Sequence, residues 1–117
     1  MQITERAMGQ TTILDVSGPL SGGDGTTLLK DKVNSLVVQK LTRIVINLAD
    51  VAHIDSAGLG ELVTCLTTVS KAGGRLKLLN LTKRNKDLLS ITRLVTVFET
   101  FDSEEEAVAS FGTTATV

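Results

Sequence analysis

Hydrophobic residues along the chain alternate between short continuous runs and stretches where they recur every three or four positions. The runs at residues 12–16, 43–48, 75–81 and 95–101 are rich in β-branched and leucine side chains, which predicts four strands. Residues 2–7 are expected to pair beside the first of these strands. The run at 43–48 is almost unbroken, as is typical of a central strand covered on both faces.

A helix is predicted after each of these four runs, because apolar residues there recur at helical spacing. The second helix ends at Gly73 and Gly74, the usual place for a left-handed cap, and the third covers residues 83–94. The fourth begins at Ser103, where a serine followed three residues later by Glu106 matches a capping box. The residues expected to face the core are, helix by helix, Leu29, Val33, Leu36 and Val37; Leu59, Leu62, Val63, Leu66 and Val69; Leu88, Ile91 and Leu94; and Ala107, Val108 and Phe111.

The predicted order of elements is β-β-α-β-α-β-α-β-α. Strands joined through helices require right-handed crossovers, so this order predicts a single α/β domain with a mixed, mainly parallel sheet and about four helices. The first strand is expected at an antiparallel edge. The domain covers residues 1–112, and the threonine-rich residues 113–117 are expected to form a frayed tail.

Composition narrows the class of protein. The chain has 117 residues with 12 Lys and Arg against 13 Asp and Glu, and 42% of its residues are hydrophobic. The hydrophobic content predicts a folded domain. The near-equal numbers of acidic and basic residues mean that the chain lacks the basic excess by which nucleic-acid binders neutralise phosphates. One Cys and one His cannot form an internal disulfide, or a zinc site from N/S ligands alone. No apolar run reaches the ~18 residues of a membrane span, and residues 1–6 lack a secretory pattern, so we expect a cytoplasmic protein without membrane insertion.

The residues available for catalysis are few. His53 is the only imidazole and stands near Asp55 and Ser56, but no G-x-S-x-G elbow is present, and neighbouring strand residues point to opposite faces. We therefore predict that His53 packs or hydrogen-bonds locally, that the chain is not an enzyme, and that it carries no cofactor or metal. An enzyme whose turnover of esters or phosphates depends on His53 is the alternative.

Other polar or reactive groups have structural explanations. The glycine-rich loop at residues 22–25 lacks the Gly-Lys-Ser/Thr ending of a phosphate-binding loop, so loop flexibility is the preferred reading. The basic residues Lys83, Arg84 and Lys86 are read as a solvated helix face, with a docking patch for an acidic partner as the second reading. Cys65 lies near the apolar stripe of the second helix and is expected to be inert packing.

The segment at residues 55–60, Asp-Ser-Ala-Gly-Leu-Gly, stands at a strand-to-helix turn where Asp55 or Ser56 is expected to cap the helix. Glycine costs a helix about 1 kcal/mol relative to alanine, so Gly58 and Gly60 indicate that something approaches this backbone closely. The approaching group is either a neighbouring strand or another protein. The positive end of the helix dipole would tolerate a phosphate on Ser56, which adds about −1.5 to −2 charge.

Residues 44–60 closely resemble the signature of STAS domains, and more narrowly that of the bacterial anti-sigma-factor antagonists, which are small single-domain proteins. The similarity extends over essentially the whole chain. The order of strands and helices fits, and the turn Gly18-Pro19-Leu20 falls where the family has its own Gly-x-Leu.

This resemblance implies a partner-switching mechanism with Ser56 as the phosphoacceptor. The unphosphorylated protein would bind an anti-sigma factor that is also a serine kinase, and would thereby free a sigma factor. Phosphorylation would weaken the complex, and a PP2C-type phosphatase would reset it, while ATP and magnesium belong to the kinase. The residues that would form the partner-binding face are Asp55, Ser56, Ala57, Gly58, Leu59 and Gly60, with Leu59 as an apolar contact, together with Ser21 and Asp24.

One position departs from the family. Many antagonists carry Asp where this chain has Ser21, and Asp24 follows three residues later. The target is then either a divergent kinase or the partner of another STAS branch. A second functional reading is a structural subunit on the ATPase of a lipid-transporting ABC system, in which Ser56 would be a contact residue. Formation of a weak homodimer also stays open.

Overall fold

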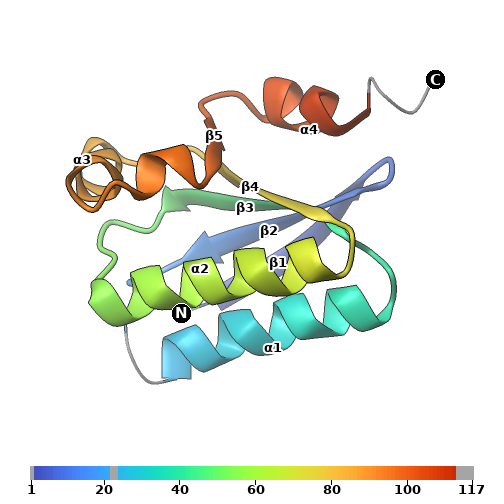
Figure 1. The fold of residues 1–117 in the computed structure, drawn as a ribbon, viewed down its shortest axis with the longest axis horizontal. Helices are drawn as coiled ribbons and strands as arrows, with labels where there is room; N and C mark the ends of the chain where they lie inside the picture. Colours follow the sequence, from blue (N-terminus) through green and yellow to red (C-terminus); the bar gives the residue numbers. More distant parts are fainter. Residues whose placement is uncertain (1, 22–23, 113–117) are drawn as a thin grey trace.

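A computed structural model describes residues 2–21 and 24–112, and the predicted tail at 113–117 lies outside this range. Its strands form one five-stranded sheet in the order β1-β2-β3-β4-β5 (Figure 1). The first pair is antiparallel and the other three pairs are parallel, which confirms a mixed, mainly parallel sheet with an antiparallel edge. The strands are β1 (Gln2–Met8), β2 (Thr11–Ser17), β3 (Arg43–Asp50), β4 (Arg75–Leu79) and β5 (Glu99–Phe101).

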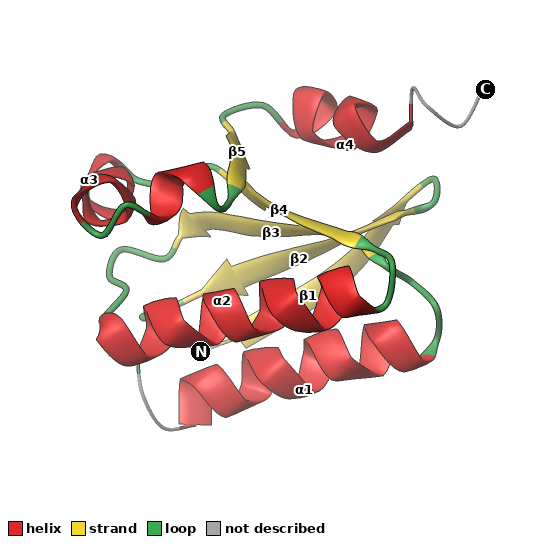
Figure 2. Cartoon of the chain, in the orientation of Figure 1, coloured by secondary structure: helices red, strands yellow, loops and turns green. Residues whose placement is uncertain are grey.

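The helices cover both faces of the sheet. Helices α1 (Asp24–Val38) and α2 (Ser56–Lys71) lie side by side on one face, and α4 (Glu104–Gly112) lies on the other (Figure 2). Helix α3 (Lys83–Ile91) lies at the end of the molecule where β3 ends and α2 begins (Figure 1). The predicted α/β order is therefore confirmed for the described residues.

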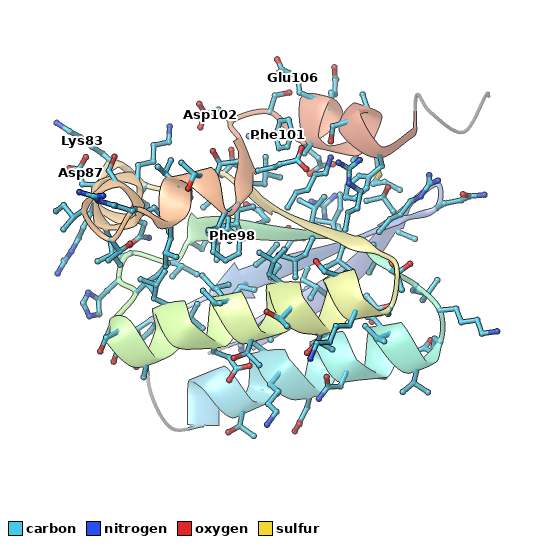
Figure 3. The ribbon with its side chains drawn as sticks, in the orientation of Figure 1. Lys83, Asp87, Phe98, Phe101, Asp102 and Glu106 are labelled. Atoms are coloured by element: carbon cyan, nitrogen blue, oxygen red, sulfur yellow. The ribbon has the colours of Figure 1, made fainter. Side chains whose placement is uncertain are left out.

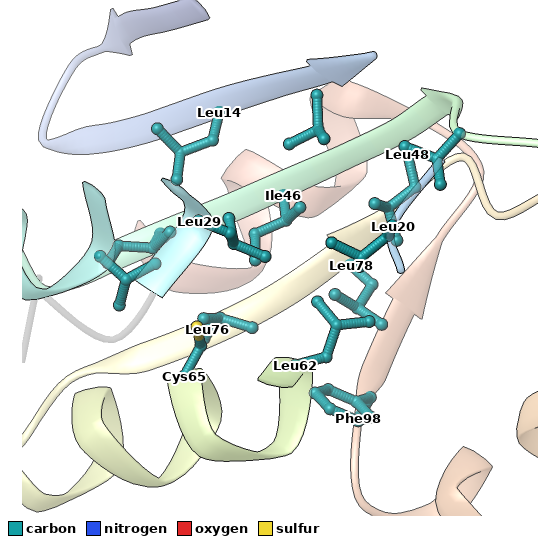
Figure 4. Packing of buried hydrophobic residues seen from close by; sticks show 14 of the residues in the cluster. Leu14, Leu20, Leu29, Ile46, Leu48, Leu62, Cys65, Leu76, Leu78 and Phe98 are labelled. Carbon is teal, nitrogen blue, oxygen red and sulfur yellow. The ribbon is translucent and has the colours of Figure 1, made fainter. Parts of the chain in front are cut away.

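Strand β3 is the centre of the core, as its apolar run predicts. Ile44 and Ile46 pack in the cluster between the sheet and helices α1 and α2, which also includes Cys65 (Figure 4). Val45 points to the opposite face and packs with Phe111 of α4. All three β3 side chains are fully buried, so both faces of this strand are covered. Removing this apolar surface from water is the main source of the fold's stability.

Charged side chains connect the sheet to α4, which the hydrophobic pattern did not indicate. Lys77 is 1% exposed; its ammonium donates to the Ser110 hydroxyl at 2.6 Å and lies 4.4 Å from the centre of the Phe111 ring. Arg6 of β1 bridges Asp15 and Glu104, and its guanidinium holds the pKa of both carboxyls below their usual range. These contacts join β4 and the edge strand β1 to the last helix.

The end of the chain differs from the prediction in two ways. Helix α3 stops at Ile91, and residues 94–96 form a short 3-10 helix, η1 (Leu94–Thr96), so the last strand is only three residues long. Ile91, expected to face the core, is 80% exposed, whereas Asn85 and Leu89 are buried. The reason is a hydrogen bond: the buried Asn85 amide donates to the Val51 carbonyl at 2.8 Å and turns that face of α3 inward.

The residue that follows the C-cap of α3 has a left-handed backbone conformation, and a prediction about stability follows from it. Arg93 follows the C-cap of α3 with φ 64°, a conformation that costs an L-residue about 1 kcal/mol. We expect Arg93→Gly to raise the free energy of unfolding by about 0.5–1 kcal/mol. Glycine adopts the left-handed conformation without strain, and this gain exceeds the cost of the greater flexibility of glycine in the unfolded chain. Asp87→Gly, at an exposed position in the middle of α3, is the control and should lower the free energy of unfolding. If urea denaturation showed that both variants change the free energy of unfolding in the same direction, the backbone of Arg93 would not be strained.

Candidate functional site

The loop after β3 leads directly into the first turn of α2. Asp55 is the N-cap residue: its backbone is extended, and its carboxylate Oδ1 accepts from the Gly58 amide at 2.8 Å. The first backbone bond of the helix runs from the Leu59 amide to the Asp55 carbonyl at 2.9 Å. Of the two residues expected to cap, Asp55 therefore does so. Ser56 is left as the first residue of the helix, with its hydroxyl not needed for capping.

Gly58 is required by a close approach from the same chain. A Cβ added at Gly58 would lie 2.1 Å from the Leu20 carbonyl oxygen. Leu20 is held there because its amide donates to the His53 carbonyl at 2.9 Å and its carbonyl accepts from the Asp55 amide at 3.2 Å. At Gly58, the group that approaches the backbone closely is therefore a segment of the same chain. At Gly60 an added Cβ would meet nothing within 4 Å.

The six residues of the segment divide into an outer and an inner set. Ser56, Ala57 and Gly60 are exposed and Asp55 is half-buried. Gly58 is buried, and Leu59 is 7% exposed and packs in the main core. Leu59, predicted to be an apolar contact of the partner-binding face, therefore exposes little surface, because the periodicity that places it at the start of the inward stripe directs its side chain into the core.

The second predicted part of the face begins at the end of β2. Leu20 forms an isolated parallel bridge with Ile54, which brings Ser21 to the end of the molecule that carries Ser56. Ser21 is half-buried. Asp24 is the first residue of α1, and its side chain lies outside the described part of the chain.

The electrostatics at Ser56 favour an added anion. The first-turn amides and the positive end of the dipole of a 16-residue helix point toward this end of α2. A phosphate on Ser56 would meet this positive end, although the Asp55 carboxylate beside it adds repulsion. An exposed hydroxyl at the first turn can be modified without removing the cap that holds the helix.

Two further residues of this region behave as structural groups. Asn85, which sequence reasoning did not single out, ties α3 to the loop at Val51; a polar residue within an apolar helical pattern is the only signal that could have found it. Burial raises the pKa of the Cys65 thiol to about 12, so it stays protonated near neutral pH. This agrees with the packing role expected for Cys65. His53 is half-exposed.

Among residues 2–21 and 24–112, no group of three or more His, Cys, Asp or Glu side chains is arranged to hold a metal ion. Within the same range, no helix combines the length and the hydropathy needed to cross a membrane.

The STAS domain family matches residues 2–107. The Bacillus subtilis anti-sigma-B factor antagonist is 41% identical over 61 residues, which is 52% of this chain and 56% of that protein. The matched segments span 56–58% of the lengths of the curated relatives.

Solved structures share this fold over most of the chain. A crystal structure from Thermotoga maritima, of a candidate anti-sigma factor antagonist, has a TM-score of 0.85 and 26% identity and covers 92% of each chain. The phosphorylated form of the Bacillus cell fate determinant SpoIIAA has a TM-score of 0.73 and 20% identity, with coverage of 94% of this chain and 99% of that one. At that identity the second likeness concerns the fold alone.

Proposed function

The chain belongs to the STAS domain family, and from this premise we propose that it is an anti-sigma factor antagonist switched by phosphorylation of Ser56. In its unphosphorylated form it binds an anti-sigma factor that is also a serine kinase, and a sigma factor is released. The kinase transfers the γ-phosphoryl group of ATP to the Ser56 hydroxyl, and the complex weakens. A PP2C-type phosphatase hydrolyses the phosphoserine and restores binding.

The observation that carries this proposal is the position of Ser56. Its side chain is exposed at the first position of α2, while Asp55 supplies the cap. A modification there changes the charge of the surface and leaves the helix start intact. The names of the relatives support the binding role, since the Bacillus subtilis protein is an anti-sigma-B factor antagonist.

The proposed partner-binding face consists of an exposed part and its support. Ser56, Ala57 and Gly60 present the surface, and the Leu20–Ile54 bridge brings Ser21 to the same end of the molecule. Asp24, at the start of α1, is proposed as a further member of the face. Gly58 and Leu59 hold this surface in place from below, through the contact with Leu20 and through the core. The proposed role is binding rather than catalysis, and His53 has no catalytic part in it.

A charge at Ser56 provides the test of this role. We expect Ser56→Asp to weaken binding to the anti-sigma factor by about ten-fold or more, because the new carboxylate adds charge that must be desolvated at the interface. The tagged chain captures the partner from native cells, and calorimetry with the purified partner measures the affinity. Ser70→Asp, an exposed serine at the other end of α2, is the matched control and should bind as wild type does.

Two results of these experiments would contradict the proposal. Equal affinity of the Ser56→Asp and wild-type chains would remove the switch. Recovery of an ABC ATPase in place of an anti-sigma factor would favour the structural-subunit reading, in which Ser56 is a contact residue.

A further inference from the structure

A groove lies between α3 and the loop that leads into α2. We call it the α3 groove; its volume is about 520 Å³. Its apolar lining comes from Ile54, which is buried, Leu88, which is half-buried, and Ile91, which is 80% exposed. A largely apolar hollow with an exposed isoleucine at its rim is typical of a surface that receives another molecule.

Charged side chains surround this apolar lining. Lys83, Arg84 and Asp87 line the groove and are exposed. Lys83 and Asp87 extend from α3 into solvent at this end of the molecule (Figure 3). Within residues 2–21 and 24–112, neither Lys83 nor Arg84 forms an ion pair, whereas the next lysine, Lys86, pairs with Asp102 at 2.9 Å. Two cations against one carboxylate leave a positive excess here, although the chain as a whole carries −1.

The α3 groove is lined by the residues that directly precede the phosphoacceptor segment along the chain. Ile54 and His53 line it and stand only two and three residues before Ser56. Two residues of extended chain span at most about 7 Å, so the Cα atoms of Ile54 and Ser56 lie within that distance. This is close to the screening length of about 8 Å at physiological ionic strength, so a phosphate on Ser56 acts electrically on whatever occupies the groove.

We propose that the α3 groove receives a segment of the partner protein in which apolar side chains stand next to carboxylates. The apolar side chains cover Leu88 and Ile91, and the carboxylates meet Lys83 and Arg84. This inference rests on the proposed function and adds the chemistry of the partner to it. It also gives phosphorylation a physical effect, because the phosphate places negative charge beside an acidic segment and repels it.

Three short peptides test the groove without the natural partner. One alternates pairs of glutamate and leucine, the second replaces its glutamates by lysine, and the third replaces its leucines by serine. Each is titrated into the isotope-labelled full chain, and amide resonances are followed by NMR. We expect the glutamate–leucine peptide to shift the amides of Ile54, Leu88 and Ile91 and to bind at least about ten-fold more tightly than the other two.

Charge reversal identifies the residues responsible. The double variant Lys83→Glu, Arg84→Glu should bind the glutamate–leucine peptide about ten-fold more weakly. The double variant Lys40→Glu, Lys71→Glu makes the same change of charge in the loop after α1 and at the last residue of α2, and it should bind as wild type does. All four side chains are exposed, and the amide spectra show that both variants are folded.

Several outcomes would overturn the proposal: shifts elsewhere, no binding at millimolar peptide, equal binding of the three peptides, or equal loss in both double variants. Phosphorylation of Ser56 is read separately. If the groove fails this titration while Ser56 is still phosphorylated by the partner kinase, the switch stands without the groove. If Ser56 is not phosphorylated while the titration succeeds, the groove stands without the switch.

Discussion

Gly58→Ala is expected to destabilise the protein by about 3 kcal/mol, at the upper end of the range for overpacked sites. The added Cβ would lie 2.1 Å from the Leu20 carbonyl oxygen, which is a backbone atom and cannot turn aside as a side chain could. Moving Leu20 would break its bond from the Asp55 amide and its bridge with Ile54. Urea denaturation followed by circular dichroism measures the loss.

Gly60→Ala is the matched control two residues further along the same helix. Nothing lies within 4 Å of a Cβ at this position, so alanine should raise the free energy of unfolding by about 0.5–1 kcal/mol through its higher helix propensity. The two glycines thus have opposite predicted signs. Equal effects of the two substitutions would contradict the account of why Gly58 is glycine.

Ser56→Ala is expected to abolish phosphorylation by the partner kinase. No other hydroxyl stands at this position of the helix, because Ala57 and Gly58 follow. Because Asp55 provides the cap, the variant should be as stable as wild type to within about 0.5 kcal/mol. The measurement is the intact mass of the chain after incubation with kinase, ATP and magnesium, where wild type gains one phosphate and the variant gains none.

Ser70→Ala is the control for that experiment. Ser70 is an exposed serine of the same helix, and its loss should leave the phosphate on Ser56 unchanged. A phosphate still gained by the Ser56→Ala chain would show that the site has been placed on the wrong residue.

The sequence allowed the fold and the strand-to-helix turn before Ser56 to be predicted because both depend on local patterns. The unbroken run of β3 is read directly as a buried strand, and Ile44, Val45 and Ile46 are fully buried. The strand-to-helix turn before Ser56 follows from capping chemistry, which acts over three residues. Patterns of this kind need no knowledge of distant parts of the chain.

The features that the sequence did not reveal depend on contacts between distant segments. The clash that excludes a side chain at Gly58 comes from Leu20, 38 positions earlier in the chain. The orientation of α3 depends on the bond from Asn85 to Val51, which leaves Ile91 exposed against its hydrophobic character. The burial of Lys77 needs Ser110 and Phe111 of the last helix. Residue type alone suggests the opposite environment for both Lys77 and Ile91.

We propose that one phosphate on Ser56 controls binding to the anti-sigma factor. The most direct measurement is the dissociation constant of the purified complex before and after complete phosphorylation of the wild-type chain, with the modified residue identified by mass spectrometry. We expect a single phosphate on Ser56 and a dissociation constant at least about ten-fold higher, with the original value restored by phosphatase treatment. An unchanged dissociation constant with Ser56 fully phosphorylated would contradict it.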